Sequence, residues 1–258
     1  MRDHDFRIRR RELTQKMGSD QRFLAVSREW FAESVRHRYS YNFDWLGLPA
    51  IQYPQDTVFL QELIWSSKPD LIIETGVARG GSLLLSASMM VLLDLEKKKV
   101  VDLANSANSA RVVGVEIALS DENREAIANH MLSPYIALVD GSSTASESLD
   151  KIRQIISHNS STNPMVILDS NHSHNHVFAE LNLYSELVSV GGFIVVMDTA
   201  IEQLDSEFHD SNRWGKGDNP MTAVLQFVDE NPNFTIDETL TEKLMISVAP
   251  QGVLRRTS

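Results

Sequence analysis

The chain has 258 residues, which is enough for one large domain with a buried core. It has 24 basic and 35 acidic side chains, a formal net charge of -11 that would repel a nucleic acid. The absence of cysteine excludes disulfides, thiolate metal ligands and cysteine nucleophiles. No apolar run is long enough to span a bilayer, and the charged start lacks a signal-peptide pattern. We therefore expect a cytoplasmic protein with no nucleic-acid or membrane partner.

The first 40 residues mix charged side chains with spaced apolar ones, which predicts one or two amphipathic helices. We expect residues 1–44 to form an N-terminal helical extension and residues 45–258 to form the main domain. Apolar side chains exposed on such an extension suit subunit contacts, so a homo-oligomer is expected. Proline and glycine exclude a regular helix between Trp45 and Tyr53, and Asp56 is a candidate cap for a helix over residues 58–65.

From residue 69 onward, short apolar runs alternate with longer segments of helical periodicity. Such an alternation is typical of a doubly wound α/β fold with a mostly parallel sheet, and two closing strands suggest an antiparallel C-terminal hairpin. Residues 97–99 and 104–110 are predicted to form an exposed loop. The predicted strands are 71–73, 111–117, 135–139, 165–168, 193–197, 234–236 and 243–248, and the predicted helices are 82–95, 121–130, 149–156, 177–188 and 221–228.

A glycine-rich loop follows the first predicted strand and runs from Glu74 through Gly76 to Gly80, Gly81 and Ser82. Glycine lets the backbone approach a ligand closely, and the start of the next helix offers unpaired N–H groups. The spacing E-x-G-x-x-x-G differs from the G-x-G-x-x-G of a dinucleotide site. Because a tight turn also needs glycine for steric reasons, the loop indicates either a ligand site or a packed turn.

Acidic residues end the next two predicted strands. Glu116 is placed where a carboxylate can accept hydrogen bonds from ribose hydroxyls, which suits a nucleoside without separating NAD from S-adenosylmethionine. Asp140, Gly141 and Ser142 follow the third strand, where an acid or a hydroxyl can meet an adenine amino group. The same three residues also suit an ordinary turn in which the aspartate caps the following helix.

The polar run from Asp169 to His176 follows the fourth strand, and Asp198 follows the fifth. Ligands of open parallel sheets bind at this edge, and two carboxylates meeting there would repel unless a cation such as Mg²⁺ separated them. His172 is a candidate general base or, alternatively, a hydrogen-bonded loop histidine. Histidines at alternate positions, without cysteine, give zinc little support.

Together these residues resemble the cephalosporin hydroxylase and rhamnosyl O-methyltransferase family, a branch of the Rossmann-like methyltransferases. The resemblance covers about residues 40–255. The motifs that carry it are Trp45-Leu46-Gly47 with Gln52 and Asp56, Asp70 to Gly76 with Gly80-Gly81-Ser82, Val113 to Glu116, Leu168 to His172, Asp198-Thr199, and Asn219-Pro220-Met221 with Ala223, Phe227 and Asn231-Pro232.

The resemblance implies that S-adenosylmethionine binds over the glycine-rich loop, with an acid on the ribose and the turn after the third strand near the adenine. The cofactor contacts that it implies are Glu74, Gly76, Gly80, Gly81, Ser82, Glu116, Asp140, Gly141, Ser142 and Asp169.

The resemblance also implies Mg²⁺, held by an acid after strand four and an acid pair after strand five, with a histidine base three residues beyond the first acid. Asp169, Asp198 and His172 match those places. Met197 stands where the pattern has glutamate, and a thioether is a poor ligand for a hard cation. Either Asn171 supplies an additional oxygen, or the enzyme acts without the metal, or the protein binds its cofactor without turnover.

We therefore predict an S-adenosylmethionine-dependent O-methyltransferase that acts on a hydroxyl of a small molecule, either a sugar or a natural product. Asp169 and Asp198 would orient this acceptor through Mg²⁺, and His172 would remove its proton. The polar segment 206–219, which contains Trp214, is a candidate lid. The alternatives are a non-catalytic, cofactor-binding partner of another biosynthetic enzyme and an NAD-dependent oxidoreductase, which the glycine spacing disfavours.

Overall fold

The computed structural model describes residues 2–97, 110–205, 208, 213–238 and 242–258. Its main sheet has the strand order β5-β4-β3-β6-β7-β9-β8. Neighbouring strands among β3 to β7 pair in parallel, whereas β9 is antiparallel to both β7 and β8. These pairings confirm the predicted fold class. The strands are β3 (Leu71–Thr75), β4 (Val112–Glu116), β5 (Ile136–Asp140), β6 (Pro164–Leu168), β7 (Phe193–Val196), β8 (Phe234–Ile236) and β9 (Val253–Arg256).

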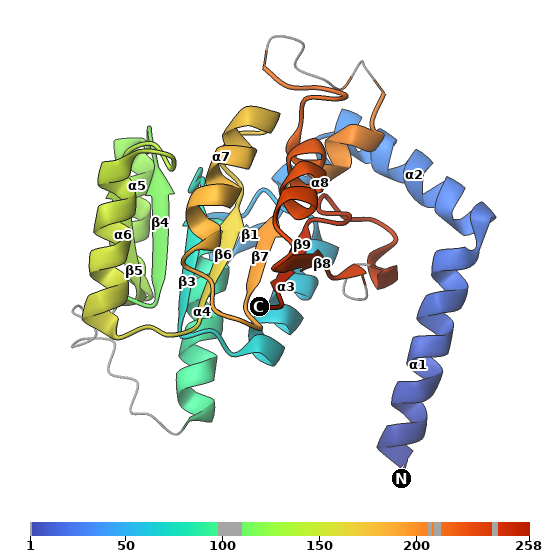
Figure 1. Cartoon of the computed structure of the whole chain (residues 1–258), viewed down its shortest axis with the longest axis horizontal. Coiled ribbons are helices and arrows are strands. Elements are labelled where there is room, and N and C mark those ends of the chain that lie inside the picture. Colours follow the sequence, from blue (N-terminus) through green and yellow to red (C-terminus); the bar gives the residue numbers. More distant parts are fainter. Residues whose placement is uncertain (1, 98–109, 206–207, 209–212, 239–241) are drawn as a thin grey trace.

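Helices cover both faces of the sheet (Figure 1). Helices α3 (Pro54–Ser67), α4 (Gly81–Glu96) and α5 (Asp121–Ala128) contribute to the core on one face. Helices α6 (Ser146–Asn159), α7 (His174–Ser185) and α8 (Pro220–Glu230) contribute to the core on the other. Short 3₁₀ segments are η1 (Tyr39–Asn42), η3 (Ser133–Tyr135), η4 (Thr199–Gln203) and η7 (Glu242–Leu244). Within the described segments, no helix is both long and apolar enough to cross a membrane.

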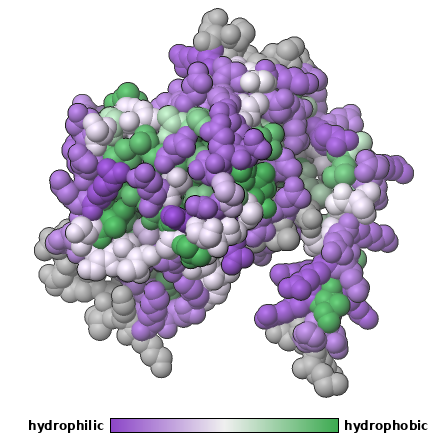
Figure 2. All heavy atoms as spheres, viewed as in Figure 1, coloured by the Kyte–Doolittle hydropathy of each residue, from purple (hydrophilic) through white to green (hydrophobic). Residues whose placement is uncertain are grey.

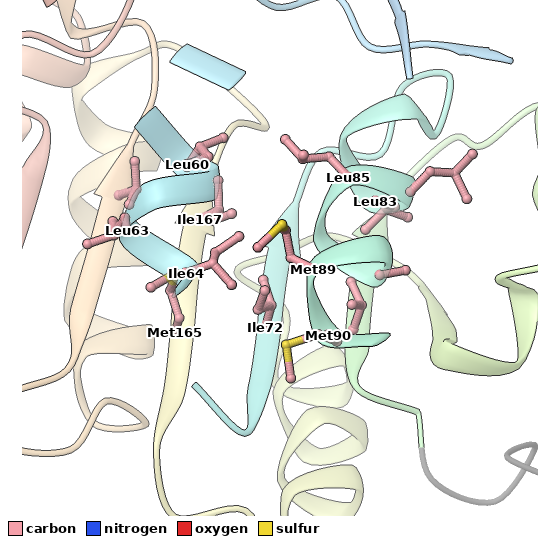
Figure 3. Close-up of a cluster of buried hydrophobic side chains, with 14 of the residues drawn as sticks. Leu60, Leu63, Ile64, Ile72, Leu83, Leu85, Met89, Met90, Met165 and Ile167 are labelled. Atoms are coloured by element: carbon pink, nitrogen blue, oxygen red, sulfur yellow. The ribbon is translucent and has the colours of Figure 1, made fainter. Parts of the chain in front are cut away.

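The central strands are apolar on both faces because helices cover both. In β3, Ile72 faces the α3–α4 side, while Leu71 and Ile73 belong to the opposite core. Figure 3 shows Ile64 of α3 and Met89 of α4 approaching this first face from two sides. Complete burial of such side chains contributes about 1.5–3 kcal/mol each, so this layer fixes how α3 and α4 lie on the sheet.

Two helices precede the sheet, as predicted: α1 (Arg2–Ser19) and α2 (Gln21–Arg36). Asp20 separates them and caps α2 by accepting hydrogen bonds from the backbone N–H groups of Arg22 and Phe23, both at 3.0 Å. Helix α1 projects from the body, and its surface is mostly hydrophilic (Figures 1 and 2). Its apolar side chains do not gather on one face, so of the one or two amphipathic helices predicted, α2 is the amphipathic one.

The segment before α3 is irregular, as predicted, and contains a short hairpin of β1 (Asp44–Trp45) and β2 (Leu48–Pro49). The predicted helix is present and longer than expected, but Tyr53 occupies its N-cap position. The prediction that Asp56 caps this helix is therefore wrong. Asp56 is fully buried and accepts hydrogen bonds from the Ser247 hydroxyl at 2.5 Å and the Val248 N–H at 3.0 Å.

The strand predicted over residues 243–248 is also wrong. This stretch contains the end of η7 and an irregular segment in which Met245 has a φ of 31°. Its apolar side chains Leu244 and Val248 pack on the α3–α4 core, so their spacing reflects core contacts and not a strand. The closing strand is β9, which joins the sheet between β7 and β8. Most of the loop predicted at 97–99 and 104–110 lies outside the described residues, because residues 98–109 are not among them. Residues 206–207 and 209–212 of the candidate lid also lie outside.

A nearly buried ion pair fastens α4 to the start of β4. Arg111 Nη1 lies 3.1 Å from Asp94 Oδ1, and the two side chains are 13% and 8% exposed. The Tyr135 hydroxyl also donates to Asp94 at 3.2 Å, while Arg111 Nε donates to the backbone oxygen of Asp70 at 2.6 Å. The pair therefore links three segments that enter the sheet at the edge opposite the site.

We expect Arg111→Met to lower the free energy of unfolding by about 3 kcal/mol, because the buried Asp94 carboxylate loses the Arg111 guanidinium as a partner. The measurement is urea denaturation at pH 7. Arg153→Met is the control, because the Arg153 side chain is 47% exposed in its ion pairs and should change stability by less than about 1 kcal/mol. Equal effects of the two substitutions would contradict a structural role for the Arg111 pair.

Candidate functional site

The carboxyl ends of the parallel strands place the predicted residues along one edge of the sheet. The strand order runs outward from β3 through β4 on one side and through β6 on the other, so the switch point lies between β3 and β6. The backbone ladder continues past the strand ends, with Asp169 N–H donating to Thr75 O at 3.0 Å and Met197 N–H donating to Leu168 O at 2.9 Å. These bonds hold the segments after β3, β6 and β7 side by side.

The glycine-rich loop is packed tightly against its own chain. Gly76 has a φ of 83°, and a Cβ there would lie 2.1 Å from the backbone oxygen of Asp169. A Cβ on Gly81 would lie 2.5 Å from the carbonyl carbon of Pro49, and one on Gly80 would meet Ile127 at 2.6 Å. Steric demand therefore explains these three glycines fully, as the packed-turn interpretation predicted, and any ligand contact adds to it.

Glu74 is buried behind this loop, where it accepts hydrogen bonds from the hydroxyls of Ser82 and, at 3.5 Å, Ser86. Burial raises the pKa of Glu74 to about 7, while the two serine hydroxyls oppose the rise. The serines are on α4, one turn apart, so Glu74 connects the end of β3 to the first turns of this helix.

Glu116 closes the other side of the loop. One of its carboxylate oxygens accepts from Val77 N–H at 3.0 Å and Ala78 N–H at 3.3 Å, and the other accepts from Ile117 N–H at 2.9 Å and Ala118 N–H at 3.2 Å. A carboxylate has about four lone-pair sites, and these four donors use them. Hydroxyls of a bound ribose would have to replace some of these backbone donors.

The turn after β5 lies next to Glu116, because Glu116 and Asp140 are partners in the β4–β5 register. Asp140 is exposed and forms an ion pair with Arg124 of α5, so it does not cap α6, whose N-cap is Ala145. Ser142 shares a hydrogen bond with Thr144 at 3.1 Å. Asp140 is thus accessible to solvent at this corner of the edge.

Two carboxylates meet between β6 and β7. Burial, the negative charges of Asp198 and Glu74, and a hydrogen bond shared with Asp198 hold the pKa of Asp169 well above its usual range. Asp198 has a φ of 56°, a left-handed backbone conformation that is unusual for aspartate. The pair therefore shares a proton or needs a cation, as the sequence suggested.

His172 reaches the same pair from the loop after β6. Its Nδ1 lies 3.5 Å from Asp198 Oδ2, and both side chains are about one-third exposed. Trp214, from the described part of the candidate lid, meets the imidazole edge-on with ring centroids 5.6 Å apart. Asp198 thus orients one imidazole nitrogen, which leaves Nε2 as the atom able to take a proton.

The neighbouring histidines have separate partners on α7 and α8. His174 contacts Thr222 at 2.8 Å and Gln226 at 2.9 Å. His176 lies 3.0 Å from the Ser143 hydroxyl and 3.6 Å from the buried Glu180. The three imidazoles therefore serve three different sets of contacts.

A divalent cation fits this edge through two carboxylates. Across the described ranges, no three His, Asp or Glu side chains are grouped as a metal site. Met197 is 3% exposed within the apolar α3–α4 core, and the Asn171 oxygen accepts from the N–H and hydroxyl of Ser173, both at 2.8 Å. Asp169 and Asp198 remain, and Mg²⁺ is commonly held by one or two carboxylates while it keeps several waters. Asn171 would have to give up a contact with Ser173 to serve as the additional ligand.

Sequence reasoning assigned no role to Gln52 in this site. Its side chain is 4% exposed, and its hydrogen bond with Asp169 lowers the pKa of that acid. The available signal was a polar residue placed between Ile51 and the Tyr53-Pro54 start of α3, within the motif that carries the family resemblance.

A cavity of about 590 Å³ lies apart from this edge, between α2, η4 and the segment 244–251. Phe31, Ala200 and Ile246 are among the residues that line it, whereas Asp169, His172 and Asp198 are not. Helix η4 lines part of the cavity and begins directly after Asp198, so it connects the cavity to the site.

A parallel sheet that ends in an antiparallel hairpin, with acids and a histidine at its carboxyl edge, is the arrangement expected of a Rossmann-like methyltransferase. The chain belongs to the rhamnosyl O-methyltransferase/CmcI family, whose model matches residues 37–257.

Individual relatives agree with this assignment. The rhamnosyl O-methyltransferase of Mycobacterium tuberculosis (strain H37Rv) is 29% identical over 231 residues, which cover 87% of this chain and 84% of the relative. The enzyme of the same name from Mycobacterium leprae is 28% identical over 213 residues, 82% of each chain. A structure of CmcI with Mg and SAM has a TM-score of 0.55 at 16% identity over 84% of this chain and 78% of that one, which supports the fold.

The raised pKa of Glu74 predicts a pH-dependent stability. In the folded chain the pKa of the Glu74 carboxyl is about 7, whereas in the unfolded chain it is close to the usual 4.5. The folded chain therefore binds this proton more tightly, and its free energy of unfolding falls as the pH rises from 4.5 through 7. We expect Glu74→Gln to remove this loss and to gain up to about 3 kcal/mol relative to the parent chain between pH 5 and pH 8, at about 1.4 kcal/mol per pKa unit.

The measurement is the free energy of unfolding in urea at the two pH values. Glu147→Gln is the control, because Glu147 is exposed in the first turn of α6. A difference between Glu74→Gln and the parent chain that stayed constant with pH would show that Glu74 has the same pKa in the folded and unfolded chains.

Proposed function

We propose that the chain is an S-adenosylmethionine-dependent O-methyltransferase that methylates a hydroxyl of a small molecule, either a sugar or a natural product. The observation that carries the proposal is the convergence of Asp169, Asp198 and His172 at the switch point, beside the glycine-rich loop. The family to which the chain belongs and the rhamnosyl O-methyltransferases related to it support the same activity.

The cofactor would lie over the glycine-rich loop, with its amino-acid end towards Glu74 and Asp169 and its nucleoside end towards Glu116 and the turn 140–142. The α-ammonium group and the sulfonium of the cofactor are positively charged, and this edge gathers negative charge. Attraction between the two would offset the repulsion between the acids. The exposed Asp140 and the Ser142 hydroxyl are the groups available to the adenine.

The chain's own residues then supply positioning and a base. The acceptor hydroxyl, held near Asp169 and Asp198, lies within reach of His172 Nε2. Its oxygen attacks the methyl carbon as the carbon–sulfur bond breaks, the electron pair of that bond stays on sulfur, and the hydroxyl proton passes to His172. Asp198 stabilises the imidazolium through Nδ1. Mg²⁺ bound by the two acids would lower the pKa of the acceptor hydroxyl.

A second candidate function is cofactor binding without turnover, as a partner of another biosynthetic enzyme. The observation in its favour is Met197, which packs into the apolar core where the family resemblance implies a carboxylate ligand. Catalysis distinguishes the two functions, since His172 has no task in a protein that only binds.

The division of the chain at residue 44, a homo-oligomeric state and a cytoplasmic location stay predictions. We expect the projecting α1, with exposed Phe6, Ile8 and Leu13, to take part in contacts between subunits.

The test is calorimetric titration with S-adenosylmethionine, with and without Mg²⁺, on the parent chain and Asp198→Ala. We expect micromolar binding by the parent chain and loss of the Mg²⁺ effect in the variant, because one of two carboxylate ligands is gone. Asp150→Ala is the control, because Asp150 is an exposed residue of α6 that pairs with Arg153. Absence of binding to the parent chain would refute the methyltransferase proposal.

Turnover is measured as release of S-adenosylhomocysteine with a panel of acceptors that begins with simple rhamnosides. We expect His172→Gln to lower kcat by about 100-fold or more while cofactor affinity is kept. His37→Gln, a change at the exposed end of α2, is the control. Cofactor binding without turnover on any acceptor, in the parent chain and the variant alike, would favour the non-catalytic partner.

A further inference from the structure

Gln52 is held rigidly beside the acids of the site. It lies in the turn between β2 and α3, where Ile51 has a φ of 53° and Tyr53 is the N-cap of α3. The Tyr53 hydroxyl in turn shares a hydrogen bond with Ser34 of α2 at 2.7 Å. Gln52 is only 4% exposed, so its amide is largely shielded from hydrogen bonds with bulk water.

The two ends of the Gln52 amide differ. One end hydrogen-bonds to Asp169. Because Oε1 has no partner, the group that donates to the carboxylate is the amide N–H. The other end, Oε1, is buried and has no hydrogen-bond partner. A buried acceptor without a partner is destabilising, and a donor at this position would remove that cost.

The charges around Gln52 restrict what that donor can be. Asp169 lies close enough to the acids Glu74 and Asp198 to be repelled by the negative charge of each. A neutral donor would form a hydrogen bond with Oε1 but would leave the negative charge of these three acids without a counter-charge. A positively charged group with several N–H bonds satisfies both needs, because one N–H can reach Oε1 while another reaches Asp169.

We infer that Gln52 is a specificity-determining residue whose Oε1 accepts a hydrogen bond from the α-ammonium group of S-adenosylmethionine. The inference rests on the proposed function. The amide turns its N–H towards Asp169, so the positive end of its dipole faces the carboxylate that would hold Mg²⁺. That orientation disfavours a metal ion shared by Gln52 and Asp169, and it leaves Oε1 for a donor with hydrogens.

The test compares two probes by calorimetry without Mg²⁺: S-adenosylhomocysteine and its deaminated analogue, which keeps the carboxylate and lacks the α-ammonium. The variant is Gln52→Met, which preserves volume and removes both polar atoms. We expect it to lose about tenfold or more in affinity for S-adenosylhomocysteine and less than twofold for the analogue, because a hydrogen bond to a charged group is lost with the first probe only.

Gln55→Met is the matched control. Gln55 is three residues along the chain, and its Oε1 is also buried without a partner, but Gln55 is not among the groups that set the pKa of Asp169. We expect equal affinities of this variant and the parent chain for both probes. Thermal melting checks that each variant folds.

An equal loss of affinity for both probes in Gln52→Met would overturn the inference. Gln52 would then maintain the shape of the site without forming a hydrogen bond to the α-ammonium group. A variant that kept its affinity for S-adenosylhomocysteine and bound Mg²⁺ more weakly would overturn it in favour of a metal ligand. If Gln52→Met does not fold, Gln52→Glu keeps an acceptor oxygen and should retain the preference for the aminated probe; loss of that preference would count against the inference. No binding of either probe by the parent chain would instead refute the proposed function.

Discussion

The parallel pairing of β3 with β6 is the constraint on which the site depends. It places Thr75 beside Leu168, so the residues that follow, Gly76 and Asp169, are forced together. The missing side chain of Gly76 is what allows this approach, since a Cβ there would overlap the backbone of Asp169. The acid therefore sits at the switch point because of a steric requirement in the neighbouring strand, independently of any ligand.

The same arrangement concentrates negative charge. Glu74, Asp169 and Asp198 come from three neighbouring strands, and Asp56 approaches from α3, where burial raises its pKa to about 6. No single contact among them is unusual. Together they form a region that is destabilising when every acid is ionised and that becomes favourable once a cation or a cationic ligand enters.

Local patterns predicted what depends on neighbours in sequence. The alternation of apolar runs and helical periodicity was sufficient for β3 to β8 and for the helices on both faces, and strand ends located Asp169, His172 and Asp198. The failures are long-range. Asp56 suited a helix cap by its position, but its partners lie 191 and 192 residues away. Residues 243–248 carry the apolar spacing of a strand because they pack on α3, and periodicity alone does not distinguish these cases.

Gln52 illustrates the same limit within the site. Its position before α3 marks it as a polar residue in an apolar setting, but does not indicate that its amide meets the carboxylate after β6. That contact exists only after the hairpin, α3 and the sheet have assembled. The tight packing of Gly81 against Pro49 brings that hairpin to the loop. A prediction based only on strand ends therefore finds the residues on one side of the site. The other side is formed by the segment before α3.

The position of β9 has a consequence for how the chain is synthesised. β9 contains residues 253–256, yet it lies between β7 and β8 inside the sheet. β8 can join the sheet only through β9, and β7 keeps an open edge until then. During translation the sheet therefore stays incomplete until Val253–Arg256 leave the ribosome, and until then the unpaired edge of β7 favours aggregation of the nascent chain.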